Sequence, residues 1–132
     1  IMKILIVDDD FVCRNLLLAM VKDYGECDVA INGKEAISAV KNSIENKTPY
    51  NLIFLDIMLE EIDGHEVLKR IRDIESNFNI GGLDGAKIIM TTILDDFASI
   101  KTAFAGQCEG YIVKPITKDK VDKQLKDLKL IR

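Results

Sequence analysis

Short runs of apolar residues alternate along the chain with longer stretches in which apolar residues recur at helical spacing. Two of these runs, residues 4–7 and 52–55, contain no polar residue, and each leads into an aspartate. Such runs are typical of strands that are buried on both faces, as in parallel α/β sheets. Strand and helix signals alternate five times. The pattern therefore predicts an α/β domain with a doubly wound, five-stranded parallel sheet.

The pattern also gives approximate bounds for the elements. We expect strands at about residues 3–7, 27–31, 52–55, 88–92 and 111–113. We expect helices at about residues 11–24, 33–46, 64–75 and 96–105, and a last one from residue 118. Gly25 is expected to end the first helix, because glycine readily adopts the conformation that caps a helix C-terminus. In the fourth helix Phe97, Ile100 and Phe104 recur at helical spacing, which predicts that they face the core.

Length and composition are those of one ordinary globular domain, which we expect to span residues 1–132. Of the 132 residues 48% are hydrophobic and 30% are charged, enough for a single core. The net charge of −4 provides no basic field, so direct binding of nucleic acid is disfavoured. No apolar run approaches the roughly 18 residues that span a membrane, and no signal peptide is recognisable. We therefore expect a cytoplasmic protein that does not bind membranes.

Chemically useful side chains stand where the predicted strands end. They are Asp8 and Asp9 after the first strand, Asp56 after the third, Thr92 at the end of the fourth and Lys114 at the end of the fifth. In a parallel sheet all carboxyl ends lie at one edge, so these side chains should gather there. Clustered carboxylates attract a divalent cation, and a metal ion, an ammonium group and a hydroxyl group together suit phosphoryl transfer.

Each acidic residue can be given a role on this basis. Asp56 would be the nucleophile and would form an aspartyl phosphate. Asp9 and Asp56 would hold Mg²⁺, for which Mn²⁺ could substitute, and Asp8 would bind it through water. The backbone carbonyl of Met58 would complete the protein ligands. The simpler interpretation of Asp10 is that it caps the helix that follows.

The remaining two residues would bind the phosphoryl group itself. Lys114 would contact one phosphoryl oxygen as a point charge, and Thr92 would donate a hydrogen bond to another. Thr91 could take the place of Thr92 if the strand ended one residue earlier. We favour Thr92 because of its spacing to Tyr111 and Lys114.

In their joint order these residues resemble the response-regulator receiver domains of two-component signalling, of the chemotaxis-regulator type. The matches are Asp8-Asp9, Asp56 with Asp63-Gly64, Thr92, Tyr111 and Lys114-Pro115. The resemblance covers essentially the whole chain and implies a flavodoxin-like (βα)5 fold with strand order 2-1-3-4-5. It also implies phosphorylation by a histidine kinase or a phosphotransfer protein, a downstream protein partner, and a cis Lys114-Pro115 peptide. Such a domain is a switch, here through Thr92 and Tyr111, and not an enzyme acting on other substrates.

The chain departs from the family pattern near the predicted phosphorylation site. Glu60 stands where a proline is usual, so this loop is expected to be looser and more acidic. Ile93 replaces a small residue and is expected to narrow access to the site. The family positions of Met58 and Leu94 border the path of the attacking water, and apolar residues there cannot orient it. The sequence therefore predicts slow self-dephosphorylation.

Two other functions remain open at this stage. Residues 8–12 also fit the start of haloacid-dehalogenase-like phosphohydrolases, in which Asp8 would be the nucleophile and Asp10 the acid. That class generally needs a substrate cap, for which 132 residues leave no room. A degenerate receiver that binds partners without phosphorylation is the other alternative, but the chain retains all five residues at the predicted edge. His65 is expected to be a surface residue and not a ligand.

Overall fold

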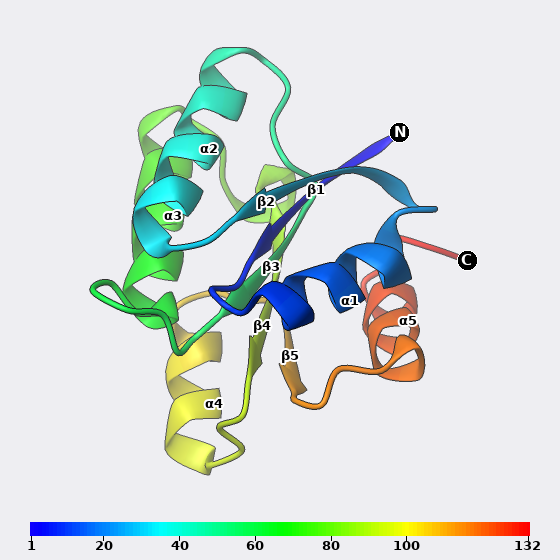
Figure 1. The fold of residues 1–132 in the computed structure, drawn as a ribbon. Helices are drawn as coiled ribbons and strands as arrows, with labels where there is room; N and C mark the ends of the chain where they lie inside the picture. Colours follow the sequence, from blue (N-terminus) through cyan, green and yellow to red (C-terminus); the bar gives the residue numbers. More distant parts are fainter.

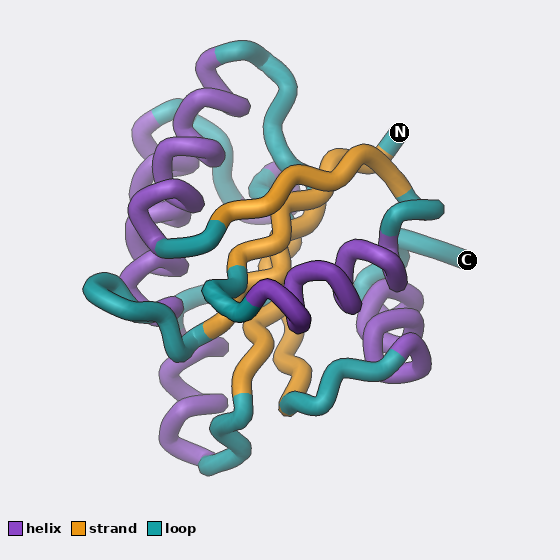
Figure 2. The backbone as a smooth tube through the Cα atoms, in the orientation of Figure 1, coloured by secondary structure: helices purple, strands orange, loops and turns teal.

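The computed structural model describes residues 1–132 and has a central parallel sheet in the order β2-β1-β3-β4-β5, which confirms the expected fold (Figures 1 and 2). The strands are β1 (Met2–Val7), β2 (Gly25–Ala30), β3 (Leu52–Asp56), β4 (Lys87–Thr92) and β5 (Gly110–Val113). The helices are α1 (Phe11–Val21), α2 (Gly33–Glu45), α3 (Gly64–Asn77), α4 (Phe97–Ala105) and α5 (Lys118–Asp127), with a 3-10 turn at Gly82–Asp84. None of the helices combines the length and apolar character that crossing a membrane requires.

Helices cover both faces of the sheet (Figure 1). Helices α2, α3 and α4 contribute to the core on one face, and α1 and α5 to the core on the other. Side chains alternate between these cores along each strand, so that Leu5 and Val7 of β1 belong to the first and Ile4 and Ile6 to the second. Burial on both faces explains why the strand sequences are uninterrupted apolar runs.

Each helix begins at a residue whose side chain accepts a hydrogen bond from a backbone N–H of the first turn. These caps are Asp10, Asn32, Asp63, Asp96 and Thr117. A cap of this kind stabilises a helix by about 1 kcal/mol. Because every cap lies in the loop that follows a strand, the caps also fix the loops at the carboxyl edge of the sheet.

The first helix ends earlier than predicted. Helix α1 stops at Val21, with Lys22 as its C-cap, and Gly25 is the first residue of β2. Gly25 therefore does not terminate the helix. It pairs with Met2 of β1, and a Cβ atom at this position would collide with the Met2 carbonyl. The close approach of two strands requires the glycine, which the local sequence signal does not distinguish from a helix cap.

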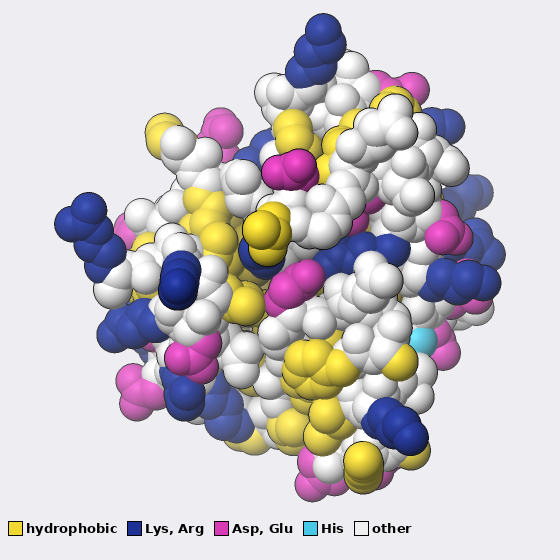
Figure 3. Space-filling model, turned by 180° about the vertical axis from the view of Figure 1, so that it is seen from behind, with side chains coloured by type: hydrophobic (Ala, Val, Ile, Leu, Met, Phe, Trp, Pro, Cys, Tyr) yellow, Lys and Arg dark blue, Asp and Glu magenta, His cyan; other side chains and the backbone are white.

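The expectation that the aromatic residues of the fourth helix face the core is wrong. Phe97 and Phe104 are 69% and 46% exposed, Ile100 is half-buried, and the one buried residue of α4 is Ala103. Helix α4 lies at the lower end of its layer beside β4 (Figure 1). Hydrophobic side chains accordingly gather on the lower part of the molecule when it is seen from behind (Figure 3). Helical spacing identifies an apolar face but not whether other elements cover it.

Candidate functional site

Three carboxylates meet at the carboxyl edge of the sheet, as predicted. Asp8 directly follows β1 and Asp56 is the last residue of β3. Both are buried, at 2% and 3% exposure, whereas Asp9 is exposed. One carboxylate oxygen from each residue lies within 4.8 Å of those of the other two. Parallel strands that end side by side bring these residues together although they lie far apart in the sequence.

Lys114 lies between two of these carboxylates. Its Nζ donates hydrogen bonds to Oδ2 of Asp8 at 3.0 Å and to Oδ2 of Asp56 at 3.1 Å. The side chain of Lys114 is only 15% exposed. The Lys114-Pro115 peptide is cis, as the resemblance implied. The structure thus brings the predicted lysine to the predicted nucleophile.

The electrostatics of the site follow from two buried carboxylates that share one ammonium group. Burial raises the pKa of Asp56, and the nearby charge of Lys114 offsets this effect only in part. Burial alone would lower the pKa of Lys114, but its hydrogen bond to Asp8 and the charge of Asp56 outweigh burial and raise it. Lys114 therefore stays positive, while the carboxylates remain incompletely neutralised. A divalent cation would supply the missing charge.

The residues present fit such a cation. The remaining oxygens of Asp8 and Asp56 accept hydrogen bonds from the backbone N–H groups of Asp10 and Met58, at 2.8 and 3.0 Å, which orients both carboxylates. The carbonyl of Met58 accepts no hydrogen bond and is available as a ligand. Carboxylate and carbonyl oxygens are the hard ligands that Mg²⁺ prefers. Asp8, Asp9 and Asp56 could therefore hold a metal ion.

Thr92 and Tyr111 are connected through one residue of the β4–α4 loop. The backbone N–H of Leu94 donates to Oγ1 of Thr92 at 3.2 Å, and the Tyr111 hydroxyl donates to the Leu94 carbonyl at 2.8 Å. Thr91 instead pairs with Asp56 in the sheet, and both threonines are buried. The structure therefore links Thr92, and not Thr91, to the tyrosine.

Of the three apolar residues that were expected to border the site, two line a groove beside it and one does not. Met58 and Leu94 line a groove of about 370 Å³ between the β3–α3 loop and α4. Ile93 does not line this groove, and its side chain is 64% exposed. The exposure of Ile93 gives no support to the expectation that it narrows access. Glu60 and Glu61 are exposed in the same loop, where Glu61 has a positive φ of 65°.

Sequence reasoning missed Arg14, which lies in the first turns of α1. Its Nη1 donates a hydrogen bond of 2.9 Å to the backbone carbonyl of Asp8. Arg14 thereby helps to hold the loop that carries Asp8 and Asp9. A cation near a helix N-terminus interacts unfavourably with the helix dipole. The arginine at this position could therefore have indicated that its side chain has a specific partner.

The sequence matches a known family over most of its length. Residues 4–126 match the family model described as the response regulator receiver domain. Chemotaxis protein CheY of Halobacterium salinarum is 31% identical over 127 residues, which cover 96% of this chain and 95% of that protein. Hybrid signal transduction histidine kinase L of Dictyostelium discoideum is 30% identical over 125 residues, which cover 94% of this chain. The chain spans only 7% of the length of that kinase.

The fold recurs in solved structures as well. CheY from Borrelia burgdorferi, in a complex with CheX, BeF3 and Mg²⁺, superimposes with a TM-score of 0.83 at 25% sequence identity. The match covers 99% of this chain and 90% of that chain. The fold therefore recurs in a protein that was crystallised with BeF3 and Mg²⁺.

Proposed function

This chain belongs to the response regulator receiver domain family, a signalling module of two-component systems, and we propose that residues 1–132 form one receiver domain phosphorylated on Asp56. One observation carries the proposal. Asp56 is buried at the end of β3, with the Lys114 ammonium 3.1 Å from its carboxylate and two further carboxylates beside it. This is the arrangement that phosphoryl transfer to an aspartate requires.

We propose a phosphohistidine of a histidine kinase or phosphotransfer protein as the donor. The similarity to a segment of a hybrid histidine kinase supports this class of partner. One Asp56 oxygen forms the new P–O bond while the P–N bond of the donor breaks, and the electron pair of that bond stays with the imidazole. Lys114 then pairs with a phosphoryl oxygen, and the Thr92 hydroxyl donates to another. When bound, Mg²⁺ supplies positive charge beside the phosphoryl oxygens.

The geometry disfavours the phosphohydrolase alternative. That mechanism needs Asp8 as the nucleophile and Asp10 as a free acid. Asp8 and Asp56 are engaged alike, each by one backbone N–H and by Lys114, so Asp10 is the residue that distinguishes the two mechanisms. The Asp10 carboxylate accepts a hydrogen bond from the N–H of Val12 as the cap of α1, which also lowers its pKa. Asp10 is thus held as an anion in a structural role.

We expect Mg²⁺ to raise the melting temperature of the protein. An ion that binds only the folded state, at a free concentration 100 times its Kd, stabilises that state by about 2.7 kcal/mol. Asp9→Asn should lose most of the shift, because it removes one charged ligand and leaves the buried core untouched. Asp23→Asn, which removes an exposed carboxylate beyond the other end of α1, is the matched control and should keep the full shift. Differential scanning calorimetry with and without Mg²⁺ makes the comparison. An undiminished shift in Asp9→Asn would place the metal elsewhere.

We also expect slow loss of the phosphoryl group from Asp56. The groove beside the site is lined by Met58 and Leu94, whose apolar side chains cannot orient a water molecule. A Met58→Asn, Leu94→Glu double variant should lose the phosphoryl group faster, by on the order of tenfold. Leu83→Asn, at a 90% exposed position outside the groove, is the control. Phosphoprotein decay followed by intact-protein mass spectrometry measures the rates. Equal decay of the double variant and wild type would rule out control by water access.

A further inference from the structure

Strand β5 leads directly into Lys114, although it is a short strand at the edge of the sheet. It has four residues and pairs with β4 only. The Lys114 N–H donates to the Thr92 carbonyl of β4 at 2.7 Å, so the backbone groups of every second residue of this segment face β4. Tyr111 and Val113 lie between these residues, and their carbonyls face away from the sheet. Side chains that bind the outward carbonyls can therefore set the position of β5.

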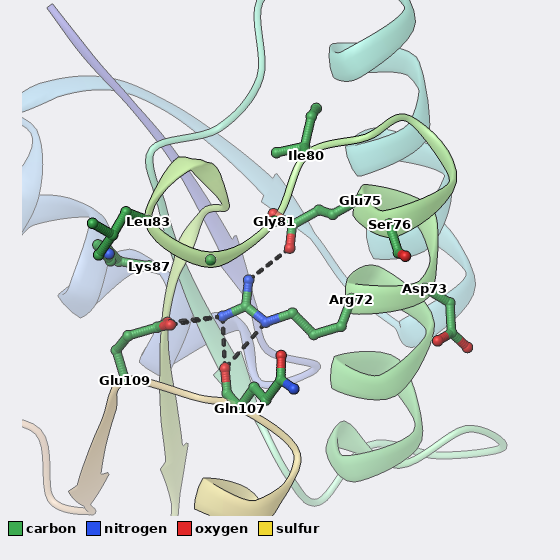
Figure 4. Close-up of a pocket in the computed structure, with 11 residues that line it drawn as sticks. Arg72, Asp73, Glu75, Ser76, Ile80, Gly81, Leu83, Lys87, Gln107 and Glu109 are labelled. Atoms are coloured by element: carbon green, nitrogen blue, oxygen red, sulfur yellow. Dashed lines mark hydrogen bonds and ion pairs between the residues drawn. The ribbon is translucent and has the colours of Figure 1, made fainter.

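The amino end of β5 is held by Arg72 of α3 (Figure 4). Nε and Nη2 of Arg72 donate to the Gln107 carbonyl at 3.1 and 2.7 Å, and Nη2 also donates to the Glu109 carboxylate at 2.8 Å. Glu109 directly precedes β5, and its carboxylate accepts the N–H of Ile88 in β4 at 2.7 Å. The start of β5 is thus fixed against α3 and β4.

Helix α5 binds both outward carbonyls of β5. Nε2 of Gln124 donates to the Tyr111 carbonyl at 3.4 Å, and Nζ of Lys120 donates to the Val113 carbonyl at 2.9 Å. The bond from Lys120 is the shorter of the two and its donor is charged, so it is the stronger. The carboxyl end of β5, next to Lys114, is therefore held mainly by Lys120.

Lys120 also binds the chain on the far side of Lys114. Its Nζ donates to the Pro115 carbonyl at 2.9 Å. One ammonium group thus joins the carbonyl of Val113, just before Lys114, to a carbonyl just after it. The bridged segment is the backbone from which the Lys114 side chain reaches its two carboxylates. Lys120 therefore restricts the place from which the Lys114 ammonium enters the site.

The position of Lys120 in α5 indicates that its ammonium has a specific partner. Lys120 lies in the first turn, where a positive charge interacts unfavourably with the helix dipole. Its two carbonyl partners offset this effect, because carbonyl oxygens carry partial negative charge. Lys123 lies one turn farther along and instead pairs with Asp127 at 2.9 Å, with its side chain 75% exposed. The two lysines carry the same charge on one helix and differ in what they bind.

We propose that Lys120 is a positioning residue for phosphoryl transfer, which holds the backbone of Lys114 so that the Lys114 ammonium meets the phosphoryl group at Asp56. This inference rests on the proposed function. The Lys120 ammonium binds only the two carbonyls, so it acts through Lys114 and not on the phosphoryl group itself. A misplacement of about 1 Å can slow a reaction by on the order of 100-fold. The metal ligands lie in the loops after β1 and β3, which Lys120 does not touch.

Replacement of Lys120 tests the proposal. Lys120→Met keeps most of the aliphatic stem and removes the donors, so phosphorylation by acetyl phosphate with Mg²⁺ should slow by on the order of tenfold. Lys120→Arg keeps the charge and the donors and should restore most of the rate. Lys123→Met, which removes the same charge from the same helix, is the control and should keep the wild-type rate. Intact-protein mass spectrometry over time gives the rates. A wild-type rate in Lys120→Met, no recovery in Lys120→Arg, or an equal loss in Lys123→Met would overturn the proposal.

Metal binding separates positioning from a general loosening of the site. Lys120→Met should bind Mn²⁺ at least as tightly as the wild type, because a less firmly held Lys114 competes less with the ion for the carboxylates. Electron paramagnetic resonance of Mn²⁺ measures this affinity without any phosphorylation. Weaker Mn²⁺ binding together with slower phosphorylation would show that Lys120 merely supports the fold, and would overturn the positioning role.

The reactivity of Lys114 distinguishes failure of this inference from failure of the proposed function. The Lys114 ammonium is paired with two carboxylates and its side chain is 15% exposed, so it should react slowly with acetic anhydride. In Lys120→Met it should react faster, and in Lys123→Met at the wild-type rate, as read by peptide mass spectrometry. If Asp56 takes up no phosphoryl group but Lys114 reacts faster only in Lys120→Met, the proposed function is wrong and the hold of Lys120 on Lys114 stands. Unchanged reactivity of Lys114 in Lys120→Met would overturn that hold, whatever happens at Asp56.

Discussion

Asp56→Asn should abolish phosphorylation of this protein. The amide keeps the size of the side chain but lacks the charge that makes the carboxylate a nucleophile and a metal ligand. Incubation with Mg²⁺ and acetyl phosphate should add a phosphoryl group to the wild type and none to the variant, as read by intact-protein mass spectrometry. Asp23→Asn, an exposed substitution, should be labelled like the wild type.

Peptide mapping of the labelled wild type separates the alternatives. An adduct on Asp56 that is lost in acid and in base is the expected result for an aspartyl phosphate, which is a mixed anhydride. An adduct on Asp8, together with turnover of phosphate esters, would instead identify a phosphohydrolase. Undiminished labelling of Asp56→Asn would exclude Asp56 as the acceptor, whichever residue carries the label.

The stability of Asp56→Asn shows whether the variant is folded. Burial raises the pKa of Asp56 above its ordinary value of 3.8, so the folded state binds this proton more tightly than the unfolded state does. Stability from such a group is present below pH 3.8 and is lost as the pH rises through the folded pKa. Without divalent cations, the variant should therefore be more stable than the wild type at neutral pH, and this advantage should disappear in acid. Urea denaturation at several pH values measures the difference.

Arg72→Met should lower the free energy of unfolding by about 3–5 kcal/mol, which is a larger loss of stability than we expect from any of the substitutions named above. Methionine matches much of the apolar stem of arginine, but it leaves the carboxylates of Glu75 and Glu109 without their cation. It also removes the donors to the carbonyls of Ala86 and Gln107. For a domain whose total stability is about 5–15 kcal/mol, this is a substantial part.

The matched control for that substitution lies on the same helix. Arg70 pairs with Glu66 at 3.3 Å, but the two side chains are 51% and 44% exposed. Because water screens such a pair, Arg70→Met should cost less than about 1 kcal/mol. Urea denaturation of both variants gives the two differences. Similar losses for Arg70→Met and Arg72→Met would show that burial does not strengthen the ion pairs of Arg72 with Glu75 and Glu109.

The apolar pattern of the chain was sufficient to predict the sheet, its parallel strands and the edge at which the acidic residues meet. Strands that are buried on both faces leave a strong local signal, and parallel strands must end at the same edge. The meeting of Asp8, Asp9, Asp56 and Lys114 follows from those two facts alone. The order of the strands came from the resemblance to the receiver family and was confirmed.

Other features depend on which surfaces meet in space, and local sequence carries no record of that. Gly25 has a helix-cap signal but serves a close strand pairing, and the aromatic face of α4 has a core-like period but points into solvent. Glu75 lies at a position that continues the inward face of α3. Only the folded chain shows that Arg72 pairs with the carboxylate of Glu75 and also with that of Glu109, which lies 37 residues from Arg72 in the sequence. Spacing along an element defines a face, whereas burial, partners and free space are set by the elements that pack against it.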